Sequence, residues 1–148
     1  MSLPLIFAAM AALENANSVA LGINHAYAPP PEVFTDLPVA VRYNETPEFL
    51  TASRLLGRYN KYHIKVELHF ARGVLQESYP VALACIEPFQ VLYANNLSIS
   101  GTCDVSRFRE PPYDGPMYLR HKEGQPITIG IIFYMWAKEM LDDITVNL

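Results

Sequence analysis

The chain has 148 residues, 51% of them hydrophobic and 18% charged, which fits one globular domain able to bury a core without metals or disulfides. Its formal net charge of -4 excludes a strongly basic protein of the kind that binds nucleic acid or anionic membranes without specificity. We therefore predict a single domain over residues 1–148, in which residues 139–148 form a C-terminal tail.

A helix is predicted at the start of the chain, from Leu3 to Asn15. Ala and Leu dominate this run, and Pro4 falls in the first turn, where proline is tolerated. The run has no preceding Lys or Arg, which a signal peptide requires, and it is too short to span a bilayer, so we expect no membrane partner. An extended piece is predicted over Val19 to Tyr27, before a connector with three consecutive prolines.

Two strands are predicted next, separated by a loop or wide hairpin over residues 44–60. The first strand spans Leu37 to Tyr43. The second spans Tyr62 to Phe70 and alternates strictly between apolar and polar residues, which predicts one core face and one solvent face. The predicted solvent face carries His63, Lys65, Glu67 and His69.

A second helix is predicted from Ser78 to Asn95. Pro88 removes a backbone donor in its middle, so the helix should kink or split in two. A strand is predicted from Ser98 to Phe108. The stretch from Glu110 to Gly124 reads as a polar loop with proline and Asp-Gly turns, which contains a short strand around residues 117–120.

The last predicted strand, from Pro126 to Lys138, is apolar on both faces. A strand in a small antiparallel sheet usually alternates between apolar and polar residues, so something is expected to cover each face of this one. We predict that the chain's own helices cover one face and that another subunit or a second layer covers the other. The order helix, strand, strand, helix, strand, strand predicts an α+β fold: a two-layer antiparallel sheet with two helices on one face.

Motifs that would indicate catalysis are missing: there is no HExxH, CxxC, GxSxG or phosphate-binding glycine loop. His63, Glu67 and His69 share one face of a predicted strand. Residues two apart lie about 6.6–6.8 Å apart along a strand, so one metal ion reaches two of them with difficulty. We predict no catalytic residue, no metal and no cofactor. Cys85 and Cys103 are predicted to be buried thiols, with a disulfide between them as the alternative.

Candidate residues for contacts with other subunits come from two places. Tyr134 and Trp136, with Ile132 beside them, lie on the second apolar face of the last strand, and aromatic side chains dominate contact energies. The alternative is that they pack in the core under the second helix or the tail. Arg54 and Arg58 share a face if their segment is helical. They could form ion pairs within the chain or with a neighbour, or bind nucleic acid.

The order of these elements resembles the tail terminator, or tail completion, proteins of bacteriophages with long non-contractile tails. The resemblance covers nearly the whole chain and rests on order and hydrophobic pattern rather than on an invariant signature. After the N-terminal helix, it is carried by the strings AYAPPPEVF, LPVAVRY, HIKVELHF, SYPVALACIEPFQVLYAN and ITIGIIFYMWAKEM.

The resemblance implies a virion protein that forms a ring, commonly a hexamer, assembled in the host cytoplasm. Such a ring caps the tail tube, ends its polymerisation and presents a surface to the head-side connector or neck protein. Genome DNA would pass through the lumen without specific binding. Two other functions stay open: another neck, head-tail joining or tail tube component, and a small enzyme or ligand-binding domain.

Overall fold

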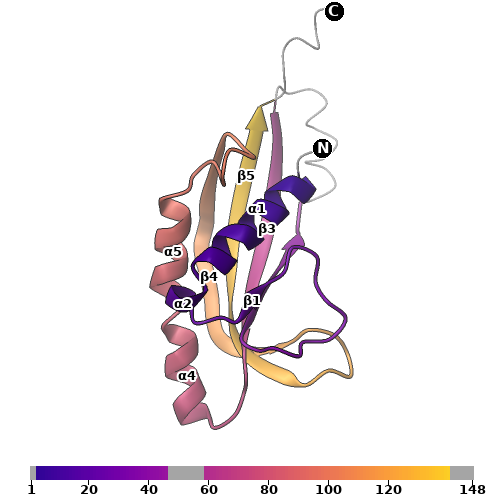
Figure 1. Cartoon of the computed structure of the whole chain (residues 1–148), viewed down its shortest axis with the longest axis vertical. Coiled ribbons are helices and arrows are strands. Elements are labelled where there is room, and N and C mark those ends of the chain that lie inside the picture. Colours follow the sequence, from indigo (N-terminus) through magenta and orange to yellow (C-terminus); the bar gives the residue numbers. More distant parts are fainter. Residues whose placement is uncertain (1–2, 47–58, 141–148) are drawn as a thin grey trace, which may run out of the picture.

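The computed structural model describes residues 3–46 and 59–140, which form an α+β fold with a five-stranded sheet and several helices (Figure 1). The described elements are α1 (Leu3–Ala16), α2 (Ser18–Leu21), β1 (His25–Ala26), β2 (Val39–Asn44), β3 (Tyr59–Phe70), α4 (Leu75–Leu83), α5 (Ile86–Ala94), β4 (Val105–Arg120) and β5 (Ile127–Met140). Within these residues, no helix has both the length and the hydrophobicity needed to cross a bilayer.

The strands lie in the order β1-β2-β3-β5-β4. Every neighbouring pair is antiparallel except β1 and β2, which are parallel, so the sheet is mixed rather than antiparallel as predicted. The reason is the connector over residues 27–38, which lets β2 return alongside β1 in the same direction. The centre of the sheet is the long pairing of β3 with β5, from Tyr59 opposite Met140 to Phe70 opposite Ile129.

The core lies between the helices and one face of the sheet. Along β3, the predicted apolar residues Ile64, Val66 and Leu68 are fully buried there, which confirms their assignment. On β5 the same face buries Phe133, whose ring stacks on Phe89 of α5 with the centroids 4.0 Å apart. The helices pack on this one face, and Figure 1 shows α1 crossing in front of the strands, with α4 and α5 to their left.

The predicted second helix is split in two, as Pro88 suggested. α4 ends at Leu83 and α5 begins at Ile86, with turns at Ala84 and Cys85 between them. A proline ring clashes with the carbonyl group four residues earlier, which here belongs to Ala84. The break therefore falls one turn before the proline, and Pro88 itself sits in the first turn of α5, where its missing donor costs little.

The predicted extended piece over Val19 to Tyr27 is largely wrong. Residues 18–21 form the short helix α2, and only His25–Ala26 are extended. Gly22 ends α2 in the left-handed conformation, with φ of 73°, and its N–H donates to the carbonyl oxygens of Ser18 and Val19. Val19 is 95% exposed, so its apolar side chain is no sign of a buried strand.

The region from Ser98 to Gly124 also differs from the prediction. Residues 97–104 form turns, with positive φ at Ile99 and Ser100, and the strand begins only at Val105. β4 then continues to Arg120 through the predicted polar loop, with irregularities in its pairing between Phe108 and Tyr113 and between Asp114 and Met117. Prolines are tolerated here because β4 is an edge strand, where a missing N–H breaks no ladder.

Candidate assembly surfaces

The sheet face opposite the helices is covered at one end by the chain itself. The connector over residues 27–38, here called the strap, places Phe34 against His69 of β3, with ring centroids 4.8 Å apart. The strap is tied to the turn between β4 and β5, which lies at the same end of the sheet (Figure 1). His121 Nε2 lies 2.6 Å from the Pro31 carbonyl oxygen, and Lys122 Nζ lies 2.5 Å from a Glu32 carboxylate oxygen.

Under the strap, residues predicted to face solvent are buried. His69 is fully buried and Glu67 is 8% exposed, which corrects the prediction of an all-polar solvent face on β3. His69 Nε2 lies 2.8 Å from a Glu67 carboxylate oxygen, and His69 Nδ1 lies 2.6 Å from the Thr128 hydroxyl oxygen on β5. The side chains of Glu67, His69 and Thr128 are hydrogen-bonded to one another, which offsets the cost of burying their polar atoms.

This acid–imidazole–hydroxyl chain has the connectivity of a catalytic triad, but its setting is that of a structural link. Thr128 is 3% exposed, and it lines none of the cavities described among residues 3–46 and 59–140. The three side chains instead join β3 to β5 across the sheet.

We expect the Glu67 link to make the fold sensitive to acid. Burial raises the pKa of Glu67, but its hydrogen bond and charge interaction with His69, and the Lys65 ammonium, bring it below the ordinary value of 4.5. A carboxyl group with a lower pKa in the folded state stabilises the fold above its unfolded pKa and loses that contribution as the pH falls below it. The free energy of unfolding, measured by urea denaturation, should therefore drop as the pH is lowered through and below 4.5.

The Glu67→Gln variant should lose part of this acid sensitivity, and the same change at the exposed Glu123 should leave it unaltered. Equal pH dependence in the wild type and in Glu67→Gln would show that the link contributes nothing to stability.

Beyond the strap, the same sheet face is open and carries the predicted interface residues of β5. Tyr134 and Trp136 are partly exposed there, whereas Ile132 is only 9% exposed within the single chain. The burial of Ile132 therefore needs no neighbouring subunit. Arg54 and Arg58, the other predicted interface residues, lie outside the described residues.

Positive side chains lie over the aromatic rings of this open face. The Lys61 ammonium is 4.5 Å from the centre of the Trp136 ring, and the Arg109 guanidinium is 5.5 Å from the centre of the Tyr134 ring. Equivalent pairs join β2 to β3 and β3 to β5. We call this surface the cationic face; it consists of Lys61, Lys65, Arg107, Arg109 and Lys138 with Tyr43, Tyr59, Tyr134 and Trp136.

The cationic face keeps a positive excess. Among the described residues, three carboxylates lie on it: Glu45, which is 3.7 Å from Lys65 and 3.6 Å from Arg109, and Glu67 and Asp114. Its five positive side chains outnumber them. Burial lowers the pKa of His63 in the middle of the face, and the charges of Arg109 and Lys61 lower it further.

On the helical side, α4 exposes a stripe of apolar side chains. Leu75, Tyr79 and Leu83 are 47%, 42% and 43% exposed and follow one another at intervals of four residues, which places them on one side of the helix. We call these three residues the α4 stripe. Tyr118 of β4, 55% exposed, lies under the guanidinium of Arg72, which precedes α4.

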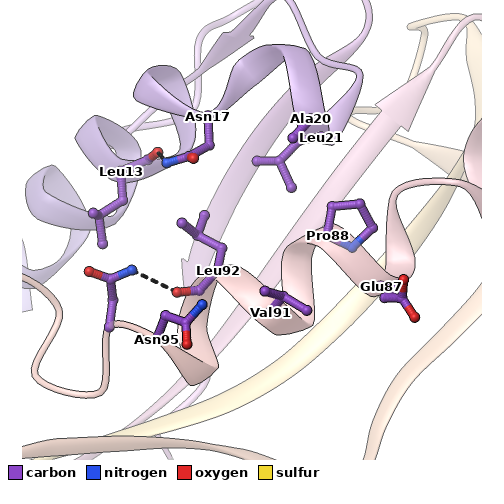
Figure 2. A pocket seen from close by; sticks show the side chains of 10 residues that line it. Leu13, Asn17, Ala20, Leu21, Glu87, Pro88, Val91, Leu92 and Asn95 are labelled. Carbon is purple, nitrogen blue, oxygen red and sulfur yellow. Dashed lines mark hydrogen bonds between the residues drawn. The ribbon is translucent and has the colours of Figure 1, made fainter.

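A groove of about 520 Å³ separates α5 from the end of α1 and from α2, and Figure 2 shows Leu21 pointing toward α5 across it. The side-chain amides of Asn17 and Asn96 each donate to a carbonyl of their own helix, Leu13 and Leu92, at 2.8 Å. These polar groups therefore do not converge on a ligand position, as an enzyme or binding pocket requires.

Both cysteines and the predicted strand face with His63, Glu67 and His69 lie within the described residues. Cys85 and Cys103 are free and buried, as predicted, and burial raises the pKa of their thiols to about 12 and about 11. Among the described residues, no group of three or more His, Cys, Asp and Glu side chains could hold a metal ion.

Comparison with known protein families finds no family model that matches the chain. Comparison with curated proteins likewise finds no match.

Proposed function

We propose that this chain is a structural subunit that associates into a ring, caps a bacteriophage tail tube and joins it to the head-side connector. The order of elements supports this, because it resembles that of tail terminator proteins. The gathering of α1, α4 and α5 on one sheet face also fits a two-layer domain of that kind. On this proposal the protein is not an enzyme and carries no cofactor.

The α4 stripe is the observation that carries the proposal. Three large side chains at one-turn intervals on a single helix face are each more than two-fifths exposed, although the chain buries an extensive core elsewhere. Single exposed apolar residues are ordinary, but a contiguous row marks a surface that another protein covers. A subunit that closes into a ring needs such a surface, because each copy contacts the next.

The place of the protein in the particle follows from the same proposal. The ring sits in the tail or neck of the virion, contacts the tail tube protein on one side and the neck protein on the other, and assembles in the host cytoplasm. Genome DNA passes through its lumen without specific binding, in keeping with the net negative charge of the subunit.

Replacing Leu83 by Asp is expected to weaken self-association at least about tenfold, because a charge would enter the apolar contact. Leu83 is 43% exposed, so the fold itself should be retained. The dissociation constant is measured by sedimentation equilibrium, with circular dichroism to check the fold. The matched control is Val19→Asp on α2, which removes an even more exposed side chain outside the stripe. Equal weakening by both variants, or by neither, would contradict the assignment of the stripe.

A further inference from the structure

The positive charge of the cationic face is least balanced at the end of the sheet where β5 ends. Lys61 of β3 and Lys138 of β5 lie directly opposite each other there, on the same face. Among the described residues, neither of them forms an ion pair with a carboxylate, and nor does Arg107 of the neighbouring strand β4. Like charges directly opposite each other destabilise a sheet. A carboxylate placed at this end would therefore stabilise it.

The carboxylates described nearby lie elsewhere. Glu45 lies beside Lys65 and Arg109, further along the face toward the strap. Glu139 of β5 belongs to the opposite face of the sheet, where its carboxylate oxygen accepts a hydrogen bond of 3.2 Å from the Tyr62 hydroxyl. Neither of these groups sits over the lysine pair at the end of β5.

Aromatic rings accompany the two lysines. The Lys61 ammonium lies over the Trp136 ring, and the Lys138 ammonium lies over the Tyr59 ring, 4.3 Å from its centre. Trp136 is partly exposed and Tyr59 is 40% exposed. Contacts between a cation and an aromatic ring strengthen when water is removed from them. A partner that matches this end of the face therefore carries both carboxylates and apolar side chains.

The sequence after β5 has this chemistry. Residues 141–148, LDDITVNL, follow the strand directly and contain no Lys or Arg. Asp142 and Asp143 come near the start of the segment, and Asp is one of the residues that favour turns. The apolar residues after them alternate with polar ones, as in a strand with one apolar side: Ile144, Val146 and Leu148.

We propose that the 141–148 segment turns back at Asp142 and Asp143 and lies over this end of the cationic face of its own chain. Its carboxylates pair with Lys61 and Lys138, and its apolar side chains cover the neighbouring aromatic rings. The inference goes beyond the proposed function and does not rest on it, because the contact forms within one subunit.

The length of the segment suits this path. Trp136 lies four residues before Met140, the last residue of β5, which is about 13 Å along a strand. The eight residues of the segment reach about 26–29 Å when extended, so they suffice for a reversal and a return to Trp136. A segment joined to its binding surface has an effective concentration in the millimolar range, which favours the same chain over a neighbouring copy.

A single-stranded nucleic acid is the other anionic partner for a basic, aromatic sheet, and the observations favour it less. Proteins that bind single strands offer free aromatic faces on which bases stack. Here the rings of Trp136 and Tyr59 already have Lys61 and Lys138 over them. A covered cationic face also fits a subunit through which genome DNA passes without binding.

Quenching of tryptophan fluorescence tests the proposal in the full chain, because Trp136 is its only tryptophan. A nitroxide, which quenches tryptophan on contact, is attached to Thr145→Cys; Cys85 and Cys103 are buried and should not react. The labelled protein should lose most of its Trp136 emission and recover it when ascorbate reduces the nitroxide. The same label on Glu123→Cys, in the turn between β4 and β5 at the other end of the sheet, should leave the emission unchanged.

Removing the two negative charges tests the role of the lysine pair. Asp142→Asn/Asp143→Asn in the labelled chain should shift the ratio of covered to uncovered face roughly tenfold toward uncovered, because two exposed ion pairs contribute about 0.2–1 kcal/mol each. The quenching should fall accordingly. Glu123→Lys is the matched control, since it changes the net charge by the same amount away from the face, and it should leave the quenching intact.

Three outcomes would overturn the proposal. The first is a labelled segment that does not quench Trp136, or that quenches it equally with and without the two aspartates. The second is quenching of unlabelled wild type on mixing with a labelled chain that carries Trp136→Phe, which would assign the segment to a neighbouring copy. The third is an unquenched Trp136 together with a fluorescent oligonucleotide that binds the wild type and not Lys61→Glu/Lys138→Glu, which would assign the face to nucleic acid. Ring assembly, measured separately by mass, stands or falls independently of all three.

Discussion

Replacing Arg42 by methionine is expected to lower the free energy of unfolding by about 3–5 kcal/mol, because it leaves a carboxylate buried without its partner. Arg42 of β2 and Glu14 of α1 are both fully buried, and two hydrogen bonds of 2.7 and 2.5 Å join them. The Tyr93 hydroxyl of α5 donates to the same carboxylate at 2.5 Å. The pair thereby ties two helices to the sheet.

The Arg42 guanidinium stays charged despite its burial. Desolvation works against the charge of Arg42, but the Glu14 carboxylate outweighs it and raises the pKa of Arg42 above its ordinary value. Arg42 Nε also donates to the Tyr27 carbonyl oxygen at 2.9 Å, so the guanidinium is bonded on several sides. Removing one partner therefore costs far more than the pair contributes when it is intact.

Urea unfolding of three variants tests this account. Arg42→Met should be strongly destabilised, and the double variant Glu14→Leu/Arg42→Met should recover most of the loss, because both charges are then replaced by apolar groups. Lys122→Met is the control, since it breaks a surface ion pair whose Glu32 partner is 86% exposed, and it should change stability little. A double variant no more stable than Arg42→Met would show that the buried carboxylate is not the cause.

Replacing Gly130 by alanine is expected to destabilise the fold by about 3 kcal/mol, at the upper end of what overpacking usually costs. Gly130 lies near the start of β5, opposite His69 of β3. A methyl group there would clash with the Leu68 carbonyl oxygen and would come within 2.7 Å of the Leu119 side chain. The Leu68 carbonyl oxygen belongs to the backbone of a central strand, so it cannot move away as a side chain could.

Gly124→Ala provides the matched control for this variant. Gly124 has a positive φ of 86° and nothing within 4 Å of an added methyl group, so only backbone strain of about 1–2 kcal/mol is expected. Urea unfolding of both variants measures the difference. If Gly130→Ala were no less stable than Gly124→Ala, the expected clash between the added methyl group and the Leu68 backbone would be contradicted.

Local signals in the sequence predicted much of the fold. The alternation along β3 and the apolar run of β5 placed the two central strands, and Pro88 predicted the break between α4 and α5. β4 was predicted only at its two ends, up to Phe108 and around residues 117–120. Its middle was predicted as a loop because its prolines and Asp114-Gly115 look the same in a loop as in an edge strand with irregular pairing. Only the position of β4 at the edge of the sheet, which depends on distant pairing, decides between the two.

The two apolar faces of β5 were predicted correctly, but their explanation needs a correction. One half of the second face is covered by the chain itself, since Thr128 and Ile132 are buried and the strap brings Phe34 onto neighbouring His69. The strap lies far from β5 in sequence, so no local pattern predicts its path. Of the apolar residues predicted on that face, Tyr134 and Trp136 keep partly exposed side chains.

The candidate surfaces were predicted in part. Tyr134 and Trp136 lie on an open face, but the positive side chains above them come from other strands, through a register that the sequence does not specify. The α4 stripe was missed, although its spacing of four residues is visible in the sequence. Because the helix was expected to begin at Ser78, Leu75 fell outside it and the row of three went unrecognised.

The mass of the wild-type protein in solution, alone and after mixing with tail tubes, tests the central claim most directly. The account predicts a closed oligomer of defined subunit number, formed either by the protein alone or on contact with the tube. A protein that stays monomeric at high concentration and with tubes present would contradict it.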